Sequence, residues 1–347
     1  MTTPERITHL IGHRRWDGVA DRHGEVFNPA TGEVTGLVDF ASADLVGEVV
    51  DNAAAAVAEW GQSSLATRVQ VLFRFRSLLE ANKQRLAELI TAEHGKVVSD
   101  ALGEVTRGLE VVEFACGIPH LLKGGFSENV STSVDTYSIL QPLGVVGVIS
   151  PFNFPAMVPM WFVPIAVACG NAVVVKPSEK DPSVVNAVAE LWQEAGLPDG
   201  VMNVVHGDKE AVDALLTHPS VKAISFVGST PIAQYVYEVG AKHGKRVQAL
   251  GGAKNHMLVL PDADLDLAAD AAVNAGFGSA GERCMAISVV VAVDSIADEL
   301  VARIRSRMAQ LTTGDGRTGC DMGPIVTPAA RDRIVGYVQA GIDAGAE

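Results

Sequence analysis

The sequence predicts an α/β fold in which a doubly wound parallel sheet is followed by a second, smaller α/β unit. Continuous Val and Ile runs alternate with helical segments from residue 143 onward, as strands buried on both faces of a parallel sheet require. Polar or Gly-rich motifs directly follow several of these runs, where doubly wound sheets bind their ligands. The 347 residues, 48% of them hydrophobic, suffice for about two globular domains.

The first third of the chain is expected to be helical. Residues 53–60 are Ala-rich, and residues 69–90 place apolar side chains at helical spacing. The Glu-His-Gly-Lys sequence at 93–96 interrupts this pattern. Two short stretches with alternating β-branched residues follow at 128–134 and 137–141, and they predict a β-hairpin.

The two α/β units follow in order. In the first, strands are expected at 144–150, 172–176, 201–205 and 223–227, separated by helices at 156–169, 184–195 and 211–216. In the second, strands are expected at 257–260 and 288–293, and helices at 265–277, 296–311 and 328–344. Because no strand follows the last helix, we expect the second unit to be topologically unfinished.

Composition argues against several classes of function. A net charge of −14, with no basic run longer than the pairs at 14–15 and 245–246, argues against nucleic-acid or anionic-membrane partners. The four cysteines are widely spaced without a CxxC, which indicates reduced thiols in the cytoplasm rather than disulfides or a zinc site. The histidines have no metal-ligand spacing. Neither a signal peptide nor a membrane span is expected, since prolines interrupt the longest apolar run, 152–169.

Two polar motifs follow the first two strands of the parallel sheet. Asn153 lies directly after a strand and could donate its amide to a developing oxyanion, or could merely cap the next helix. Lys176 and Glu179 follow the next strand and could bind ribose hydroxyls, or could form a solvated loop. The residues alone leave both alternatives open.

Two further motifs lie farther along the chain. Ser229 begins a helix that opens with Pro231, and helix N-termini attract phosphates. No G-x-G-x-x-G is present, so a dinucleotide must bind in another way. The Gly-rich segment 278–285 delivers Cys284 just before a strand, and Arg283 beside it supplies the positive charge that favours a thiolate. The other three cysteines are expected to be packing residues.

Together and in this order, these motifs resemble the aldehyde dehydrogenase superfamily. The segments 151–155 (PFNFP), 252–256 (GAKNH) and 277–286 (FGSAGERCMA) are similar to those of the CoA-acylating methylmalonate-semialdehyde dehydrogenases. The resemblance extends from Asn28 to Ile325. It implies an aldehyde dehydrogenase-like fold and a dehydrogenase that uses NAD, with CoA as co-substrate.

The resemblance also implies residue roles. Cys284 would attack the aldehyde to give a thiohemiacetal, and Asn153 with the Cys284 backbone N–H would form the oxyanion hole. Glu179 would repel a 2′-phosphate and so favour NAD over NADP. The residues that would bind the cofactor are Ser150, Phe152, Lys176, Glu179, Lys180, Ser229 and Gly251.

One departure separates this chain from hydrolytic members of the superfamily. They carry a Glu just before the Gly-Gly pair, where it activates water, whereas Ala249 stands there in this chain. The thiol of CoA is therefore the expected acyl acceptor. Methylmalonate or malonate semialdehyde would give propionyl-CoA or acetyl-CoA with CO2, in valine or inositol breakdown. Arg107 and Arg283 match the family's Arg positions and would hold the substrate carboxylate, although Arg107 alone would be read as a solvated surface residue.

The implied domain plan has three parts. Residues 1–124 and 143–250 would form the NAD-binding domain, residues 125–142 an oligomerisation hairpin, and residues 251–347 a catalytic domain that is incomplete, because family members are longer. A homodimer or homotetramer would follow from the complete family fold. Two alternatives remain, a hydrolytic aldehyde dehydrogenase with another base and an inactive binding or assembly module.

Overall fold

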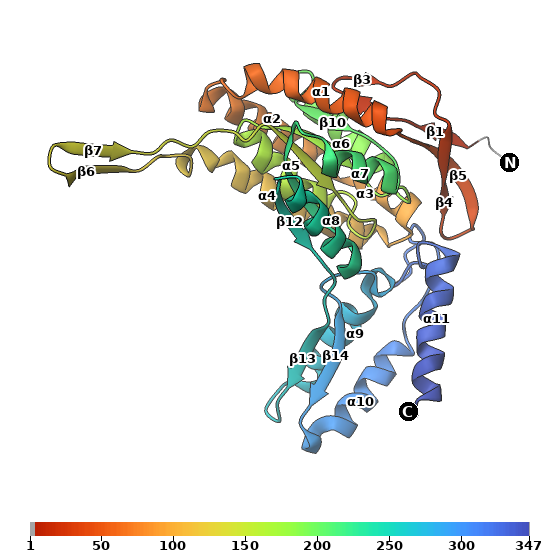
Figure 1. Ribbon diagram of the computed structural model, residues 1–347. Helices are drawn as coiled ribbons and strands as arrows, with labels where there is room; N and C mark the ends of the chain where they lie inside the picture. The colour runs from red at the N-terminus through yellow and green to blue at the C-terminus, as the bar shows by residue number, and fades with distance from the viewer. Residues whose placement is uncertain (1–3, 347) are drawn as a thin grey trace.

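A computed structural model describes residues 4–346 and centres on one seven-stranded sheet (Figure 1). In spatial order its strands are β12 (Arg246–Leu250), β11 (Val221–Val227), β8 (Val145–Ile149), β9 (Ala172–Lys176), β10 (Met202–Val204), β2 (Leu10–Ile11) and β3 (Arg14–Arg15). The strands from β12 to β10 run parallel, and β2 and β3 extend the sheet in antiparallel pairing.

Helices cover both faces of this sheet. One layer consists of α1 (Ala43–Trp60), α7 (Lys209–Thr217) and α8 (Thr230–Lys242). The other consists of α2 (Leu65–Ala81), α3 (Lys83–His94), α4 (Val98–Cys116), α5 (Met157–Ala168) and α6 (Ser183–Glu194). Along β8, Val145 and Ile149 pack into the first layer, whereas Val146 and Val148 pack into the second. The two-residue period of a strand thus buries both faces, which explains the continuous apolar runs.

The order of the strands creates a crevice at one edge of the sheet. The chain winds from β8 through β9 to β10 and then returns to β11, which pairs with β8 on its other side. Doubly wound sheets bind ligands where the winding direction reverses, beyond the carboxyl ends of the strands. Here that point lies between the ends of β8 and β11, at Ser150 and Gly228.

Three smaller elements surround the central sheet. The strands β1 (Glu5–Ile7), β5 (Glu33–Phe40) and β4 (Arg22–Asn28) form a separate sheet. The hairpin of β6 (Phe126–Ser131) and β7 (Val134–Tyr137) extends far from the body, after the short 3-10 helix η1 (Ile118–His120) (Figure 1). The second unit holds the parallel pair β13 (Asn255–Val259) and β14 (Ile287–Ala292) with α9 (Leu265–Phe277), η2 (Gly278–Gly281), α10 (Asp294–Met308) and α11 (Pro328–Asp343).

The predicted fold class is confirmed, with two local differences. The helix expected at 69–90 divides at Asn82, whose side-chain Nδ2 donates to the Leu78 carbonyl at 2.8 Å where α2 ends. The strands β1 to β5 and β12 have no predicted counterpart. Strands β1 to β3 are at most three residues long, and β4 and β12 lie at sheet edges with mostly exposed or partly exposed side chains, so they lack an apolar pattern. In β5, the central strand of its sheet, the buried Gly36 and Asp39 interrupt the apolar alternation. No helix within residues 4–346 combines the length and apolarity that crossing a bilayer requires.

Candidate active site

One cavity of about 900 Å³ opens at the carboxyl ends of β8, β9 and β11 and extends to the second unit. Apart from Arg107, it brings all the predicted site residues together: Cys284, Asn153, Arg283, Ser150, Phe152, Lys176, Glu179, Lys180, Ser229 and Gly251. The crevice expected from the sheet order and the Gly-rich loop that carries the thiol therefore border the same space.

A buried ion pair between Lys96 and Glu104 holds the backbone of Asn153. Lys96 Nζ donates to the Asn153 carbonyl at 2.6 Å and to Glu104 Oε2 at 2.8 Å, and both charged side chains are fully buried. The other oxygen of Glu104 accepts from the backbone N–H groups of Ala156 and Met157, at the start of α5. Glu104, rather than Asn153, therefore caps this helix, and the amide of Asn153 has no protein partner among residues 4–346.

The loop that carries Cys284 is anchored on two sides. The Asn255 amide donates to the carbonyls of Cys284 and Ala286, both at 2.9 Å, and ties the loop to β13. Cys284 packs beside a small apolar cluster that includes Phe154 and Val227. The thiol is partly buried and lines the cavity, as a nucleophile with access to a small substrate must.

The two predicted carboxylate-binding arginines have different environments. Arg283 lines the cavity, its side chain is 24% exposed, and its Nη2 lies 2.7 Å from Asp100 Oδ1. Arg107 does not reach the cavity: its side chain is 70% exposed and pairs with Glu110 at 3.1 Å. The cause is its position on α4, since Gly108 and Leu109 belong to the buried stripe of that helix and Arg107 does not. Arg107 therefore lies outside this cavity, and its role in binding a carboxylate stays a prediction.

The polar groups after β9 border the same cavity. Lys176 is buried, its Nζ donates to the Gly207 carbonyl at 3.0 Å, and it lies 3.6 Å from Glu179 Oε2. Burial lowers the pKa of Lys176. Lys180 Nζ lies 4.4 Å from the centre of the Phe152 ring, within the range of a cation–π contact. The alternative of a solvated loop describes this motif only in part, because Lys176 is buried while Glu179 is partly exposed.

The start of α8 offers a site for an anion. Ser229 is the N-cap of α8, but its hydroxyl oxygen accepts no capping hydrogen bond from the helix, and the hydroxyl has no other partner among the described residues. A Cβ on Gly251 would lie 3.0 Å from Thr230 Oγ1, so only glycine leaves this space open. A free hydroxyl, free helix N–H groups and a space that a side chain would fill fit the pyrophosphate of a dinucleotide. The residues present therefore fit NAD.

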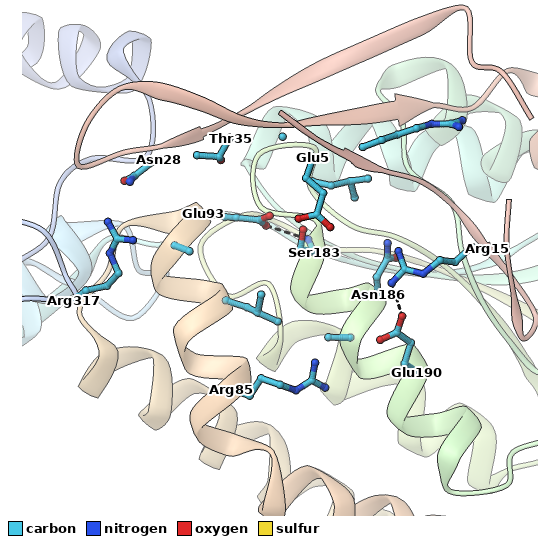
Figure 2. A pocket seen from close by; sticks show the side chains of 16 residues that line it. Glu5, Arg15, Asn28, Thr35, Arg85, Glu93, Ser183, Asn186, Glu190 and Arg317 are labelled. Atoms are coloured by element: carbon cyan, nitrogen blue, oxygen red, sulfur yellow. Dashed lines mark hydrogen bonds and ion pairs between the residues drawn. The ribbon is translucent and has the colours of Figure 1, made fainter. Parts of the chain in front are cut away.

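A second pocket, of about 390 Å³, lies between β1, β5, α3 and α6 (Figure 2). Its charged side chains are largely engaged with neighbours. Arg15 pairs with Glu190 at 2.6 Å, and Glu93 accepts from the backbone N–H of Ser183 at 3.0 Å. Burial raises the pKa of Glu93 to about 7.

Comparison with known proteins decides the family. The sequence profile of the aldehyde dehydrogenase family matches residues 16–347. A malonate-semialdehyde dehydrogenase of Pseudomonas aeruginosa is 55% identical over 345 residues, which cover 98% of this chain and 69% of that protein.

This chain belongs to the aldehyde dehydrogenase family.

Solved structures agree with this assignment. A Sinorhizobium meliloti protein described as a methylmalonate-semialdehyde dehydrogenase, solved in complex with NAD, matches with a TM-score of 0.97 and 50% identity, over 99% of this chain and 71% of that one. The methylmalonate-semialdehyde dehydrogenase of Oceanimonas doudoroffii matches with a TM-score of 0.95 and 50% identity, over 98% of this chain and 70% of that one. The predicted resemblance is confirmed, and the chain is placed among oxidoreductases that act on aldehydes.

Several residues around the aldehyde dehydrogenase site were not singled out from the sequence. Lys96, in the segment between α3 and α4, and Glu104 on α4 support Asn153, and no local motif marks a buried ion pair. Glu282 lines the cavity, and its Oε2 is buried without a hydrogen-bond partner among the described residues. Burial raises the pKa of Glu282 to about 7. The backbone N–H of Val326 and nearby cations act in the opposite direction and lower this pKa. The sequence signal that could have identified Glu282 is its position two residues before Cys284.

Proposed function

We propose that this protein catalyses NAD-dependent, CoA-acylating oxidation of methylmalonate semialdehyde and malonate semialdehyde. The products are propionyl-CoA or acetyl-CoA, CO2 and NADH. The observation that carries the proposal is the meeting of Cys284, Asn153 and the N-terminus of α8 in one cavity. The alanine at position 249, where hydrolytic members of the family carry a glutamate, supports transfer to CoA. The names of the relatives support the substrate class.

NAD is held by groups on three strand ends in this proposal. Lys176 and Glu179 bind the adenosine ribose, and Ser229 with the first N–H groups of α8 binds the pyrophosphate. Ser150, Phe152 and Gly251 form the surrounding wall, with Lys180 against the Phe152 ring. When bound, NAD accepts the hydride that leaves the substrate carbon.

The chain's own residues handle the acyl group. The Cys284 thiolate forms a C–S bond to the aldehyde carbon, and the carbonyl oxygen becomes an oxyanion. The Asn153 amide and the Cys284 backbone N–H donate to that oxyanion, and Lys96 keeps the Asn153 backbone in place. Loss of hydride re-forms the C=O bond and leaves a thioester on Cys284.

The fate of this thioester follows from residue 249. A water molecule needs a general base to attack a thioester efficiently, and the residue two positions before Gly251 is an alanine, Ala249. The CoA thiolate is a better nucleophile and needs less help. It attacks the thioester, the Cys284 thiolate leaves, and acyl-CoA forms. The substrate carboxylate, on the carbon next to the thioester carbonyl, leaves as CO2, and the resulting enolate takes up a proton from solvent.

NADH formation by the full-length protein tests the proposal. The protein is mixed with NAD and methylmalonate semialdehyde, with and without CoA, beside Cys284→Ala and a Cys169→Ala control. We expect CoA-dependent NADH formation that Cys284→Ala lowers by at least about 10³-fold and Cys169→Ala retains. Equal rates and release of free acid without CoA would instead favour a hydrolytic enzyme, and no turnover with any aldehyde would favour a binding or assembly module.

We further propose that the β6–β7 hairpin joins copies of this chain. Every residue of both strands is exposed, and Phe126, Val130, Val134 and Tyr137 present apolar side chains to solvent. An arm of this kind gains stability when a second copy covers it. Light scattering of the full-length protein is expected to give a dimer or tetramer, and Phe126→Ser with Tyr137→Ser is expected to shift it toward a monomer.

A further inference from the structure

The loop that precedes the thiol has an unusual backbone. Ser279, Ala280 and Gly281 have φ values of +50°, +54° and +76°, three consecutive left-handed residues of which only one is glycine. L-residues avoid this region because Cβ crowds the following carbonyl. A run of this kind persists only where surrounding groups hold it in place.

One carboxylate on α4 holds this loop. Asp100 Oδ2 accepts from the Ser279 backbone N–H at 3.0 Å and from the Ser279 hydroxyl at 3.1 Å. Asp100 Oδ1 lies 2.7 Å from Arg283 Nη2. One oxygen of the Asp100 carboxylate therefore binds Ser279 of the loop, and the other binds Arg283, the residue next to Cys284.

The guanidinium of Arg283 is fixed from further directions. Its Nε donates to the Ser279 hydroxyl at 3.3 Å. A Cβ on Gly278 would lie within 2.6–2.7 Å of the guanidinium carbon and both terminal nitrogens, so the group rests on the Gly278 backbone. The remaining N–H groups belong to a side chain that lines the cavity. These contacts restrict rotation of the Arg283 guanidinium, so its remaining donors keep one orientation relative to the cavity that the side chain lines.

We propose that Asp100 is a positioning residue that aims Arg283 at the carboxylate of a substrate bound near Cys284. This inference rests on the proposed function for the identity of the substrate. A loose Arg283 would still attract anions, but it would not place their carboxylates relative to the thiol. Asp100 thereby contributes to the preference for an aldehyde that carries a carboxylate over a neutral one of similar size.

Asp100→Asn separates this role from simple support of the loop. An asparagine has one acceptor oxygen, so it cannot serve both the Ser279 N–H and the Arg283 guanidinium as a carboxylate does. Glu113→Gln is the matched control, because it neutralises another carboxylate of α4 that pairs with Arg76 at 2.7 Å and leaves the contacts of Arg283 intact. Arg283→Gln alone and combined with Asp100→Asn complete the set.

The orientation of Arg283 can be tested without NAD or turnover by comparing the rates at which iodoacetate and iodoacetamide alkylate Cys284. The two reagents differ by one negative charge, and mass spectrometry of the Cys284 peptide gives each rate. We expect Asp100→Asn and Arg283→Gln each to lower the iodoacetate-to-iodoacetamide rate ratio about fivefold, and the double variant no further. Glu113→Gln is expected to leave the ratio unchanged. An unchanged or raised ratio in Asp100→Asn, or additive losses in the double variant, would overturn the proposal.

The aldehydes supply the second readout. In Asp100→Asn we expect the KM for methylmalonate semialdehyde to rise about fivefold, with the KM for propanal unchanged. A purely structural role would lower both activities alike. If the wild-type protein oxidises neither aldehyde, the proposed function fails, whereas the alkylation ratio still decides the role of Asp100. If Asp100→Asn does not fold, Asp100→Glu takes its place, and a partial retention of the ratio is expected.

Discussion

Two of the pockets of this molecule, the pocket of about 390 Å³ and the cavity of about 900 Å³, each contain a glutamate. Burial raises the pKa of both glutamates to about 7, yet the surroundings of the two differ. In the smaller pocket Glu93 accepts from the Ser183 backbone, and the neighbouring Arg15 pairs with Glu190 (Figure 2). In the larger cavity Glu282 has an oxygen without a partner. The Asn153 amide and the Ser229 hydroxyl there are likewise free of protein partners within the described residues.

This difference separates structural groups from chemical ones. Polar groups that satisfy one another lower the free energy of the fold, and they have little left to offer a ligand. Groups that converge on open space with unused donors contribute nothing to the fold, and they are available to a substrate or transition state. Changes in the larger cavity should therefore affect activity, and changes in the smaller pocket should affect stability.

The largest expected effect contrasts two asparagines. Asn153→Ala is expected to lower kcat for NADH formation by about 10²–10³-fold, because it removes one oxyanion donor, with no change in the free energy of unfolding. Asn186→Ala in the smaller pocket removes a bond to the Thr8 carbonyl at 3.0 Å and a contact with His206 at 3.2 Å. It is expected to lower the unfolding free energy by about 1–3 kcal/mol with kcat retained. Urea unfolding and steady-state rates on both variants check the contrast, and the reverse pattern would break it.

The next effect concerns the stability contribution of Glu93. Its pKa rises from 4.5 to about 7 on folding, so the folded state binds the extra proton. The stability that this group contributes is present below pH 4.5 and is lost as pH rises through 7. Relative to wild type, Glu93→Gln should gain about 3 kcal/mol of unfolding free energy between pH 4.5 and pH 8. Guanidinium unfolding at several pH values measures this, and parallel pH curves for the two proteins would contradict it.

A smaller effect is expected on cofactor choice. Glu179 lines the larger cavity and is 40% exposed, so its charge reaches a bound ribose. Glu179→Gln removes the repulsion of a 2′-phosphate and is expected to raise kcat/KM with NADP about tenfold relative to NAD. Glu194→Gln, an exposed position at the end of α6, is the control and should leave the ratio unchanged. A NADP-to-NAD ratio that stays constant in Glu179→Gln would remove this residue from the cofactor site.

The smallest effect is expected at the rim of the smaller pocket. Arg15 and Glu190 form a close ion pair, but their side chains are 57% and 40% exposed. Exposed pairs contribute little, so Arg15→Gln should lower the unfolding free energy by at most about 0.5 kcal/mol and leave kcat unchanged. A loss of activity here would mean that the smaller pocket takes part in the reaction.

The sequence predicts the parts of this molecule that obey a repeating pattern. The runs at 144–150 and 172–176 became β8 and β9, and the site residues that directly follow strands came together in one cavity. Local order is enough for this, because parallel strands end at one edge of the sheet.

Partners distant in the sequence could not be predicted in the same way. Lys96 reaches Asn153 across 57 residues, and Asp100 reaches Ser279 across 179, and neither pairing has a periodic signal. The placement of Arg107 could not be predicted either, since a match to a family position does not determine which face of α4 a side chain occupies.

The acyl adduct on Cys284 tests the central claim most directly. The full-length protein is incubated with NAD and methylmalonate semialdehyde in the absence of CoA, quenched in acid, digested and analysed by mass spectrometry. Because Ala249 offers no base for hydrolysis, the account predicts a thioester on the peptide that contains Cys284, which CoA addition discharges before the quench. Prompt appearance of free acid with no adduct, or an adduct on Cys116, Cys169 or Cys320, would contradict it.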